Sequence, residues 1–281
     1  MNRKQYNQAE NTPFGSGPLA DLFGPDGTEP FVQDFIAGKA VVPAGIYNVL
    51  QPETQRILDV LQKPSNYKIP EIPDITPEQY AARYNALDER TSSSISGLHI
   101  GHHKASAEHP DLAWLHSTMM SIPFRKKNSP KRWRNCVDVM IPKEEGNFKK
   151  HRLRIIRLCE SDFNQSLAEM LVHPVGKFFE SKNIYPETQY GSRKGKLGVS
   201  AVLNKVLTYD IARLVKMVMA AIENDAIGCY DRIIQSIVAA YLLKLGMPIE
   251  IVITICQTFR LTKHFIRTAF GISEETYEAT S

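Results

Sequence analysis

Two short segments with the character of β-strands constrain the fold of this chain more than any other feature. The residues Cys136 to Ile141 suit a strand, and Arg152 to Leu158 alternates arginines with aliphatic residues until the alternation breaks at Ile156. Between them, a Gly-Asn pair at positions 146 and 147 suits a turn. The spacing therefore predicts an antiparallel β-hairpin.

The predicted hairpin lies in a strongly basic part of the chain. From Arg125 to Arg157 there are 12 lysines and arginines against three acids, a local charge of 12 − 3 = +9. The whole chain carries +4, so the other residues sum to 4 − 9 = −5 with the histidines neutral. Concentrated cations are typical of surfaces that bind phosphates. Composition alone supports equally well a solvated surface that only aids solubility.

Helical spacing predicts the elements that surround the hairpin. Thr76 is expected to cap a helix that has proline at its first position and Gln79 three residues after the cap, and that extends to about Arg90. Residues 263–269 are expected to begin a strand. Further helices are predicted over residues 54–62, 111–120, 162–181, 199–214, 231–245 and 249–261. The mixture predicts an α+β fold.

The N-terminal third differs in composition from the rest. Residues 1–30 are rich in glycine and proline and are expected to form a disordered tail. Residues 31–90 are predicted to form a helical N-terminal region with a proline-rich connector, because four prolines fall between Lys63 and Pro77.

Cysteine spacing and hydropathy bear on the compartment. The four cysteines are separated by 23, 70 and 27 residues, which gives no CxxC pair for zinc and no dense disulfide framework. The longest uncharged run, Ile233 to Leu243, has 11 residues and is too short to cross a bilayer. We therefore expect a soluble intracellular protein of the nucleus or cytoplasm, with no membrane partner.

A carboxylate follows a short apolar run near the end of the chain. The run Met217 to Ile222 is short enough to be a buried strand, and Asp225 comes three residues later. A carboxylate at the end of a buried strand is held rigidly and can bind a hard cation through oxygen. Nucleotidyl transfer uses two Mg²⁺ ions about 4 Å apart, bridged by a carboxylate. Without further context, an aspartate in this setting is more often a turn former or a helix cap.

The residues from Asp225 to Asp231, Asp-Ala-Ile-Gly-Cys-Tyr-Asp, resemble the D-x-x-x-x-[FY]-D palm motif of reverse transcriptases, in the form found in non-LTR retrotransposon enzymes. The resemblance implies that Asp225 is the first catalytic metal ligand. It also implies that Tyr230 packs beneath the sugar of the incoming nucleotide. Asp231 opens the next predicted helix, where a carboxylate suits the positive end of the helix dipole.

Upstream segments follow in the order of the same family. Ile-Pro-Lys143 and Arg154-Ile-Ile-Arg-Leu resemble the fingers patterns I-P-K and R-P-I-S-L, with Ile155 in place of the proline. The resemblance implies that Lys143 and Arg154 project toward the nucleotide triphosphate, a role that suits a compact ammonium and a guanidinium fork.

A glycine-bearing loop, Gln189-Tyr-Gly-Ser-Arg-Lys-Gly-Lys196, resembles the family segment Q-[FY]-G-F-R-x-G-[RK], with Ser192 in place of the aromatic residue. The resemblance implies contacts with the template or nucleotide backbone. The residues assigned to nucleic-acid binding are Gln189, Gly191, Arg193, Lys194 and Lys196. Considered without its neighbours, the loop is more simply a glycine turn with exposed basic residues.

Three histidines, His99, His102 and His103, lie where related enzymes have a segment rich in small residues. They lack a fourth ligand at a spacing familiar from metal sites. We therefore expect a template-contacting loop or a packed turn.

Taken together, the resemblance implies an incomplete right-hand polymerase fold. Residues 91–214 would be a fingers-like region of helices and the β-hairpin, and residues 215–281 a partial palm with its first strand and helices. Neither a Y-x-D-D hairpin, which carries the remaining metal ligands, nor a thumb is found in the sequence.

The function implied is that of an RNA-directed DNA polymerase, with an RNA template, a DNA primer, deoxynucleoside triphosphates and Mg²⁺. We expect this chain to be inactive, because a lone Asp225 cannot hold two divalent ions. One alternative is a non-catalytic RNA- or DNA-binding protein derived from a mobile element. Another is a structural or interaction protein with fortuitous motifs. The sequence predicts no oligomeric state.

Overall fold

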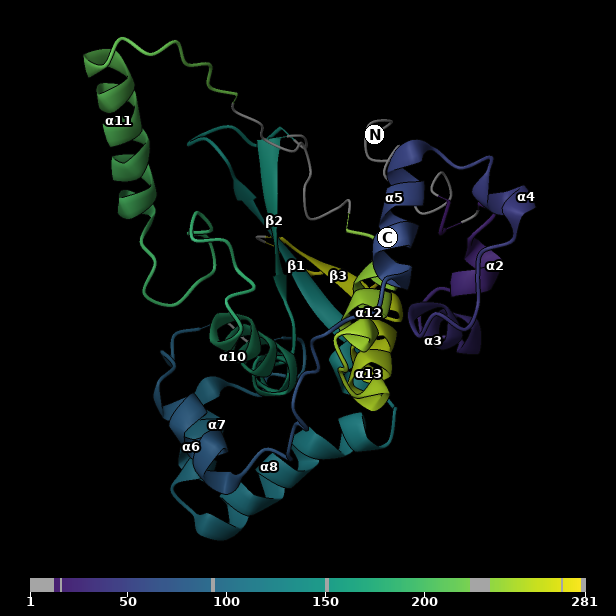
Figure 1. Cartoon of the computed structure of the whole chain (residues 1–281). Coiled ribbons are helices and arrows are strands. Elements are labelled where there is room, and N and C mark those ends of the chain that lie inside the picture. The colour runs from purple at the N-terminus through teal and green to yellow at the C-terminus, as the bar shows by residue number, and fades with distance from the viewer. Residues whose placement is uncertain are drawn as a thin grey trace.

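The computed structural model describes residues 13–15, 17–91, 94–149, 152–222, 233–268 and 270–278. It is a mixed α+β structure, as predicted, in which helices surround a small mixed sheet (Figure 1). None of the described helices is long and apolar enough to cross a membrane.

The sheet is built on the predicted hairpin, which is confirmed. Strands β1 (Asn135–Pro142) and β2 (Leu153–Leu158) pair antiparallel. Strand β3 (Lys263–Thr268) lies parallel to β1 on its other side, with β4 (Gly271–Ile272) and β5 (Tyr277–Glu278) pairing antiparallel to β3. A parallel pair needs a crossover connection, and here the chain between β2 and β3 supplies it.

The predicted helices are found with shifts at their ends, and the described residues form four further helices, at 20–23, 30–36, 44–47 and 100–107, that had no predicted range of their own. In the described residues the helices are α2 (Ala20–Phe23), α3 (Pro30–Ile36), α4 (Ala44–Tyr47), α5 (Pro52–Gln62), α6 (Pro77–Asn85), α7 (Ile100–Ala107), α8 (Pro110–Arg125), α9 (Ser161–Leu167), α10 (His173–Ser181), α11 (Gly198–Leu214), α12 (Gln235–Lys244) and α13 (Ile249–Arg260). A 3₁₀ turn, Lys131–Arg134, precedes β1, and a π-helical turn, Ala168–Val172, joins α9 to α10.

Local signals in the sequence explain where α6 begins. The Thr76 hydroxyl accepts a hydrogen bond from the backbone N–H of Gln79 at 3.2 Å, and the Gln79 side chain accepts one from the Thr76 N–H at 2.9 Å. This reciprocal capping satisfies two N–H groups that have no partner within the helix. The helix ends at Asn85, earlier than predicted.

The main core surrounds the indole of Trp133. Its ring centroid lies 5.7 Å from that of Phe124 on α8 and 5.3 Å from that of Phe163 on α9. Tyr80 and Tyr84 of α6 are buried in the same cluster, together with side chains of α12 and α13. The predicted boundary at 214/215 therefore does not divide the core, because residues from both sides of it pack together.

Residues 13–30 are not the disordered tail that their composition predicts. Phe14, Leu19 and Phe23 are buried, and the Phe14 and Phe23 rings meet edge to face at 5.0 Å. They form a second cluster with Phe35 of α3 and Ala240 of α12. Glycine and proline here shape short turns between aromatic residues, and the burial of those rings supplies the stabilisation that composition alone does not indicate.

The apolar run Met217 to Ile222 is not the buried strand that was predicted. The segment is irregular, with Val218 fully exposed and Ile222 94% exposed. A strand needs a neighbour that accepts and donates its backbone hydrogen bonds. No strand in the described part of the chain pairs with this run.

Candidate nucleic-acid interface

The hairpin places the two residues assigned to triphosphate binding on one face of the sheet. Ile141 lies directly opposite Arg154, and the Lys143 N–H donates to the Arg152 carbonyl at 2.9 Å. Side chains two positions apart on a strand share a face, and so do residues that lie opposite each other. Lys143, Arg152 and Arg154 therefore project from the same face, which we call the cationic face.

Part of the charge in the basic segment is paired with acids within the fold. In the described part of residues 125–157, five basic side chains reach an acid. The pairs are Arg125 with Asp74 at 2.5 Å, Lys127 with Glu250 at 3.3 Å, Arg132 with Glu160 at 2.6 Å and with Asp162, Arg152 with Glu144 at 3.4 Å, and Arg157 with Asp138 at 3.8 Å. The local charge of the sequence therefore overstates what the surface offers to a ligand.

Lys143 and Arg154 belong to the part of that charge that remains free. Both are exposed, and neither side chain has a hydrogen bond or an ion pair with any described residue. Arg152, on the same face, differs because Glu144 partly neutralises it. The geometry thus leaves an ammonium and a guanidinium available to phosphate oxygens.

A third cation on this face, Arg267, is not evident from the sequence. It lies on β3 directly beside Val139 of β1, which shares the face of Ile141 and Lys143. Its side chain is exposed and makes no ion pair with the described residues. Only the parallel pairing of β1 with β3 brings Arg267 to this face. No spacing in the sequence reveals that pairing.

The opposite face of the sheet is closed near the base of the hairpin. Asp138 is buried there, accepts a hydrogen bond from the Tyr277 hydroxyl and lies 3.3 Å from Nδ1 of His264. Burial alone would raise the pKa of the Asp138 carboxyl, but the hydrogen bonds from His264 and Tyr277 outweigh it and lower the pKa. The opposite face is closed only near this base, because Met140 and Ile155 farther along it are each 38% exposed.

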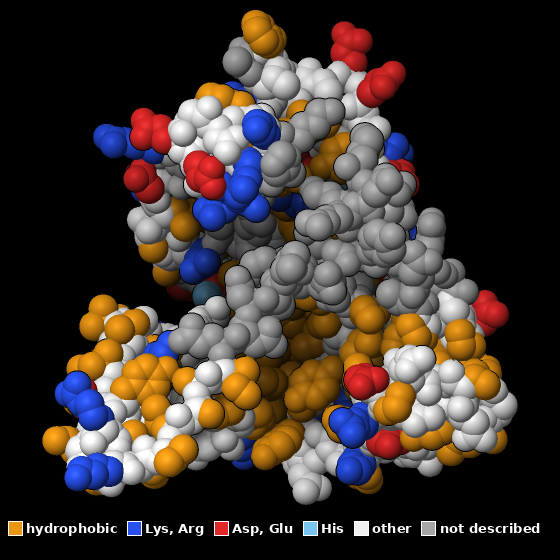
Figure 2. All heavy atoms as spheres, turned by 90° about the horizontal axis from the view of Figure 1, so that it is seen from above, with side chains coloured by type: hydrophobic (Ala, Val, Ile, Leu, Met, Phe, Trp, Pro, Cys, Tyr) orange, Lys and Arg blue, Asp and Glu red, His pale blue; other side chains and the backbone are white. Residues whose placement is uncertain are grey.

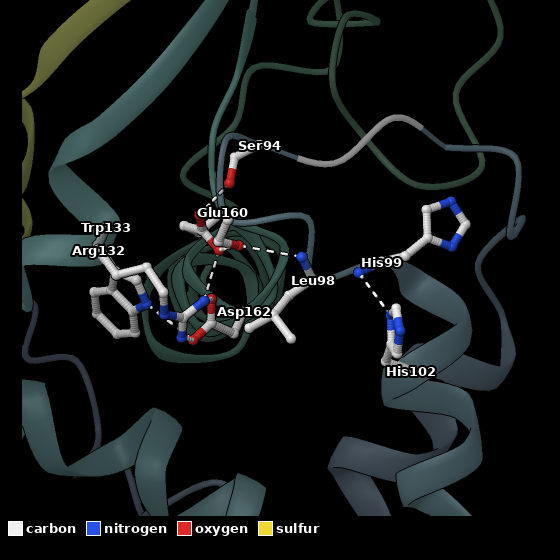
Figure 3. A network of polar contacts seen from close by, with 9 residues as sticks. Ser94, Leu98, His99, His102, Arg132, Trp133, Glu160 and Asp162 are labelled. Atoms are coloured by element: carbon white, nitrogen blue, oxygen red, sulfur yellow. Dashed lines mark hydrogen bonds and ion pairs between the residues drawn. The ribbon is translucent and has the colours of Figure 1, made fainter.

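A buried ionic network fixes the base of the hairpin (Figure 3). Arg132 donates to Glu160 at 2.6 Å and to Asp162 at 3.0 Å, and the Trp133 indole N–H donates to Asp162 at 3.0 Å. Glu160 immediately precedes α9 and Asp162 lies in its first turn, where the helix dipole favours negative charge. Burial would lower the pKa of the Arg132 guanidinium, but Asp162 and Glu160 raise it.

The same network holds the segment before α7. Ser94 and Ser96 both donate to the Glu160 carboxylate, Ser96 at 2.8 Å. In Figure 3 Glu160 lies between Ser94 and Arg132, so one carboxylate joins this segment to the 3₁₀ turn that leads into β1. Glu160 gave no signal in the sequence, because its partners are 66 and 28 residues away.

The three histidines lie at the start of helix α7, where His102 is exposed and His103 is buried. His99 precedes α7, and its backbone N–H donates to Nδ1 of His102 at 3.1 Å. His103 is buried, with its ring stacked on that of Tyr84 at 4.3 Å and its Nδ1 at 3.1 Å from the Tyr80 hydroxyl. The packing that was one of the two expectations is found for His103, but within helix α7 rather than in a turn.

The loop 189–196 is anchored by its own arginine. Arg193 makes a two-pronged ion pair with Glu180 at 2.7 and 2.8 Å, donates to the Pro186 carbonyl and lies 5.1 Å from the centre of the Tyr185 ring. Gln189 donates to the Gly191 carbonyl at 3.0 Å. These contacts occupy Arg193, so within this loop Lys194 and Lys196 are the more accessible cations. The predicted contact with template stays a prediction.

The residues assigned to the palm site lie outside the described residues, namely Asp225 and Tyr230. Among the residues that are described, no group of three or more histidines, cysteines or acids is placed to hold a metal ion.

Comparison with known proteins identifies no family: no family model matches the chain, and no curated protein matches it.

Proposed function

We propose that this chain is a reverse-transcriptase-like fragment, containing fingers and the first part of a palm, and that its hairpin binds nucleic-acid or nucleotide phosphates. The observation that carries the proposal is the shared, exposed position of Lys143 and Arg154 on the cationic face. These are the two residues that the family resemblance assigns to the triphosphate.

The geometry supports a phosphate ligand over a general basic surface. Lys143 and Arg154 make no ion pair with the described residues, whereas Arg152 and Arg157 each lie near an acid, and Arg267 adds a further charge from β3. Exposed aliphatic side chains, Ile141 and Ile156, lie between them on the same face. A sheet face with an apolar centre and cations at its margin suits a sugar–phosphate chain better than it suits a free ion.

In the complete family Mg²⁺ would supply activation of the primer hydroxyl and neutralisation of the pyrophosphate. Of the carboxylates needed for that, this sequence provides only Asp225. We propose that the chain as given binds without polymerising, and Mg²⁺-dependent primer extension by the purified 281-residue protein would refute that inactivity.

A non-catalytic RNA- or DNA-binding protein derived from a mobile element is the second candidate. The observation that favours it is the irregular, exposed segment 217–222, which does not form the palm strand that a polymerase requires. Both candidates share the hairpin as the binding surface. They differ in whether a chain that also carried a Y-x-D-D hairpin would polymerise.

The binding test uses an RNA template annealed to a fluorescein-labelled DNA primer. Fluorescence anisotropy at low salt should show that the double variant Lys143→Ala/Arg154→Ala binds about tenfold more weakly than the natural sequence, because two phosphate contacts are lost. Both residues are exposed, so thermal unfolding should change little.

Arg56→Ala is the matched control, since Arg56 is an exposed arginine on α5, away from the sheet. It should leave the affinity unchanged. Equal affinities for the double variant and the natural sequence would instead support a structural or interaction protein with fortuitous motifs.

A further inference from the structure

Two cysteines that are far apart in the sequence meet at the base of the hairpin. Cys136 lies on β1 and Cys159 directly follows β2, one position beyond the pairing of Val137 with Leu158. Their sulfur atoms are 3.0 Å apart. Cys136 is buried, whereas Cys159 is half-buried.

The strand register places this pair where a cross-strand disulfide fits. The hydrogen bond from the Lys143 N–H to the Arg152 carbonyl shows that Lys143 and Arg152 form one of the hydrogen-bonded pairs of the β1–β2 ladder. Because the two kinds of pair alternate along an antiparallel ladder, Cys136 and Cys159 fall at a non-hydrogen-bonded position. There the Cα atoms are about 4.5 Å apart and the side chains approach each other, within the range that a disulfide spans.

We propose that Cys136 and Cys159 form a reversible disulfide, with a small-molecule disulfide such as oxidised glutathione as the oxidant. The proposal is independent of the nucleic-acid function, because it rests on the geometry of the two sulfurs alone. The cysteine pair would be a modification site at the base of the hairpin.

Cys159 is the residue suited to react first. It is the more exposed of the two, and the hydrogen bond from the Cys136 thiol lowers the pKa of Cys159, which burial opposes and Arg157 assists. The Cys159 thiolate attacks one sulfur of oxidised glutathione and releases a glutathione thiolate. Cys136 then loses its proton and attacks the Cys159 sulfur, which forms the Cys136–Cys159 bond and releases the second glutathione. Overall, one protein dithiol is oxidised and one glutathione disulfide is reduced to two thiols.

Cys256 differs from Cys136 and Cys159 in its expected reactivity. It is buried on α13, and burial raises the pKa of its thiol to about 12. None of the other described cysteines is a hydrogen-bond partner of Cys256. Its thiol is therefore not expected to react under the same conditions.

The disulfide would link the two strands covalently at the open end of the hairpin. It would link the start of β1 to the residue before Glu160, and so close a loop that contains the whole hairpin with Lys143 and Arg154. A bond that closes a loop in the unfolded chain favours the folded state. Oxidation should therefore raise the melting temperature of the protein.

The test equilibrates the full chain in buffers with a graded ratio of reduced to oxidised glutathione, followed by acid quenching, alkylation and peptide mass mapping. We expect a linked pair of peptides that contain Cys136 and Cys159, two hydrogens lighter than the sum of the reduced peptides. The equilibrium constant for forming it should be on the order of a hundredfold larger for the folded chain than for the chain in concentrated urea.

Cys256→Ser should leave that constant unchanged, whereas Cys159→Ser, at the less buried position, should abolish the linked peptide. The natural sequence alone is sufficient for the main measurement if a variant does not fold. Equal constants in the folded and urea-unfolded chain, or a disulfide from Cys159 to Cys229 or Cys256 in place of Cys136, would overturn the proposal.

Discussion

At the scale of single residues, Arg132 has the largest structural consequence. Its guanidinium is one-third exposed, but it neutralises two carboxylates, of which Glu160 is fully buried and Asp162 nearly so. Breaking a buried pair leaves an uncompensated charge, which costs more than a surface pair contributes. Arg132→Met should therefore lower the free energy of unfolding by about 3 kcal/mol, measured by urea denaturation.

The neighbouring Lys131→Met is the matched control. Lys131 is exposed and has no acid partner among the described residues. Its removal should change the free energy of unfolding by less than about 0.5 kcal/mol. Similar losses for the two variants would contradict the role of the network.

His103 makes the stability depend on pH. Burial lowers the pKa of His103 to about 4 from its ordinary value of 6.5, and its Nε2 has no hydrogen-bond partner in the described structure. Between those two pH values the unfolded chain binds the proton and the folded chain does not, so stability falls as the pH falls. The free energy of unfolding should drop by about 3 kcal/mol from pH 6.5 to pH 4.

His103→Phe keeps an aromatic ring beside Tyr84 and removes the titration. Urea denaturation of this variant across the same pH range should give a flatter dependence, even if the variant is less stable overall because the Tyr80 hydroxyl loses a partner. An unchanged slope would show that other groups cause the pH dependence.

At the scale of elements, helix α11 carries many apolar side chains, but few of them are covered by other parts of the protein. It stands apart from the other labelled helices in Figure 1, and Ala212 is its buried residue in the described structure. Val202, Leu203 and Leu214 are 63%, 55% and 77% exposed. Figure 2 shows that hydrophobic side chains are exposed over wide areas of the surface seen from above. Exposed apolar patches of this kind favour association.

We therefore expect the isolated chain to self-associate through α11, as measured by sedimentation velocity over a concentration series. Val202→Glu/Val206→Glu should reduce that association, because charges replace exposed aliphatic side chains one turn apart. Asn204→Glu/Thr208→Glu introduces the same charge on the opposite side of the helix and should leave the association in place. A monodisperse, cooperatively melting monomer of the natural sequence would count against this account.

The elements that the sequence predicts best are those with local signals. The capping residues Thr76 and Gln79 fix the start of α6, and strand composition with a Gly-Asn turn fixes the hairpin. The predictions that were wrong concern segments whose conformation depends on partners distant in the sequence. Phe14 is buried because α3 and α12 provide a surface for it, and Met217 to Ile222 stays irregular because no described strand pairs with it.

At the scale of the whole molecule, the candidate site was only partly predictable. The position of Lys143 and Arg154 on one face follows from the register of the hairpin. The contribution of Arg267 depends on the parallel pairing of β1 with β3, and Glu160 acts through contacts to distant segments. Long-range pairings of this kind leave no periodic pattern in a single sequence. Neither Arg267 nor Glu160 could therefore be identified from the sequence.

We propose that the cationic face binds phosphates through Lys143 and Arg154. Each phosphate contact releases condensed counterions, so the logarithm of the binding constant falls with the logarithm of the salt concentration in proportion to the number of contacts. The most direct test measures that slope for the RNA–DNA primer-template duplex. Lys143→Ala/Arg154→Ala should reduce its magnitude by about two relative to the natural sequence, and Arg56→Ala should not change it. An identical slope for the double variant and the natural sequence would contradict the claim.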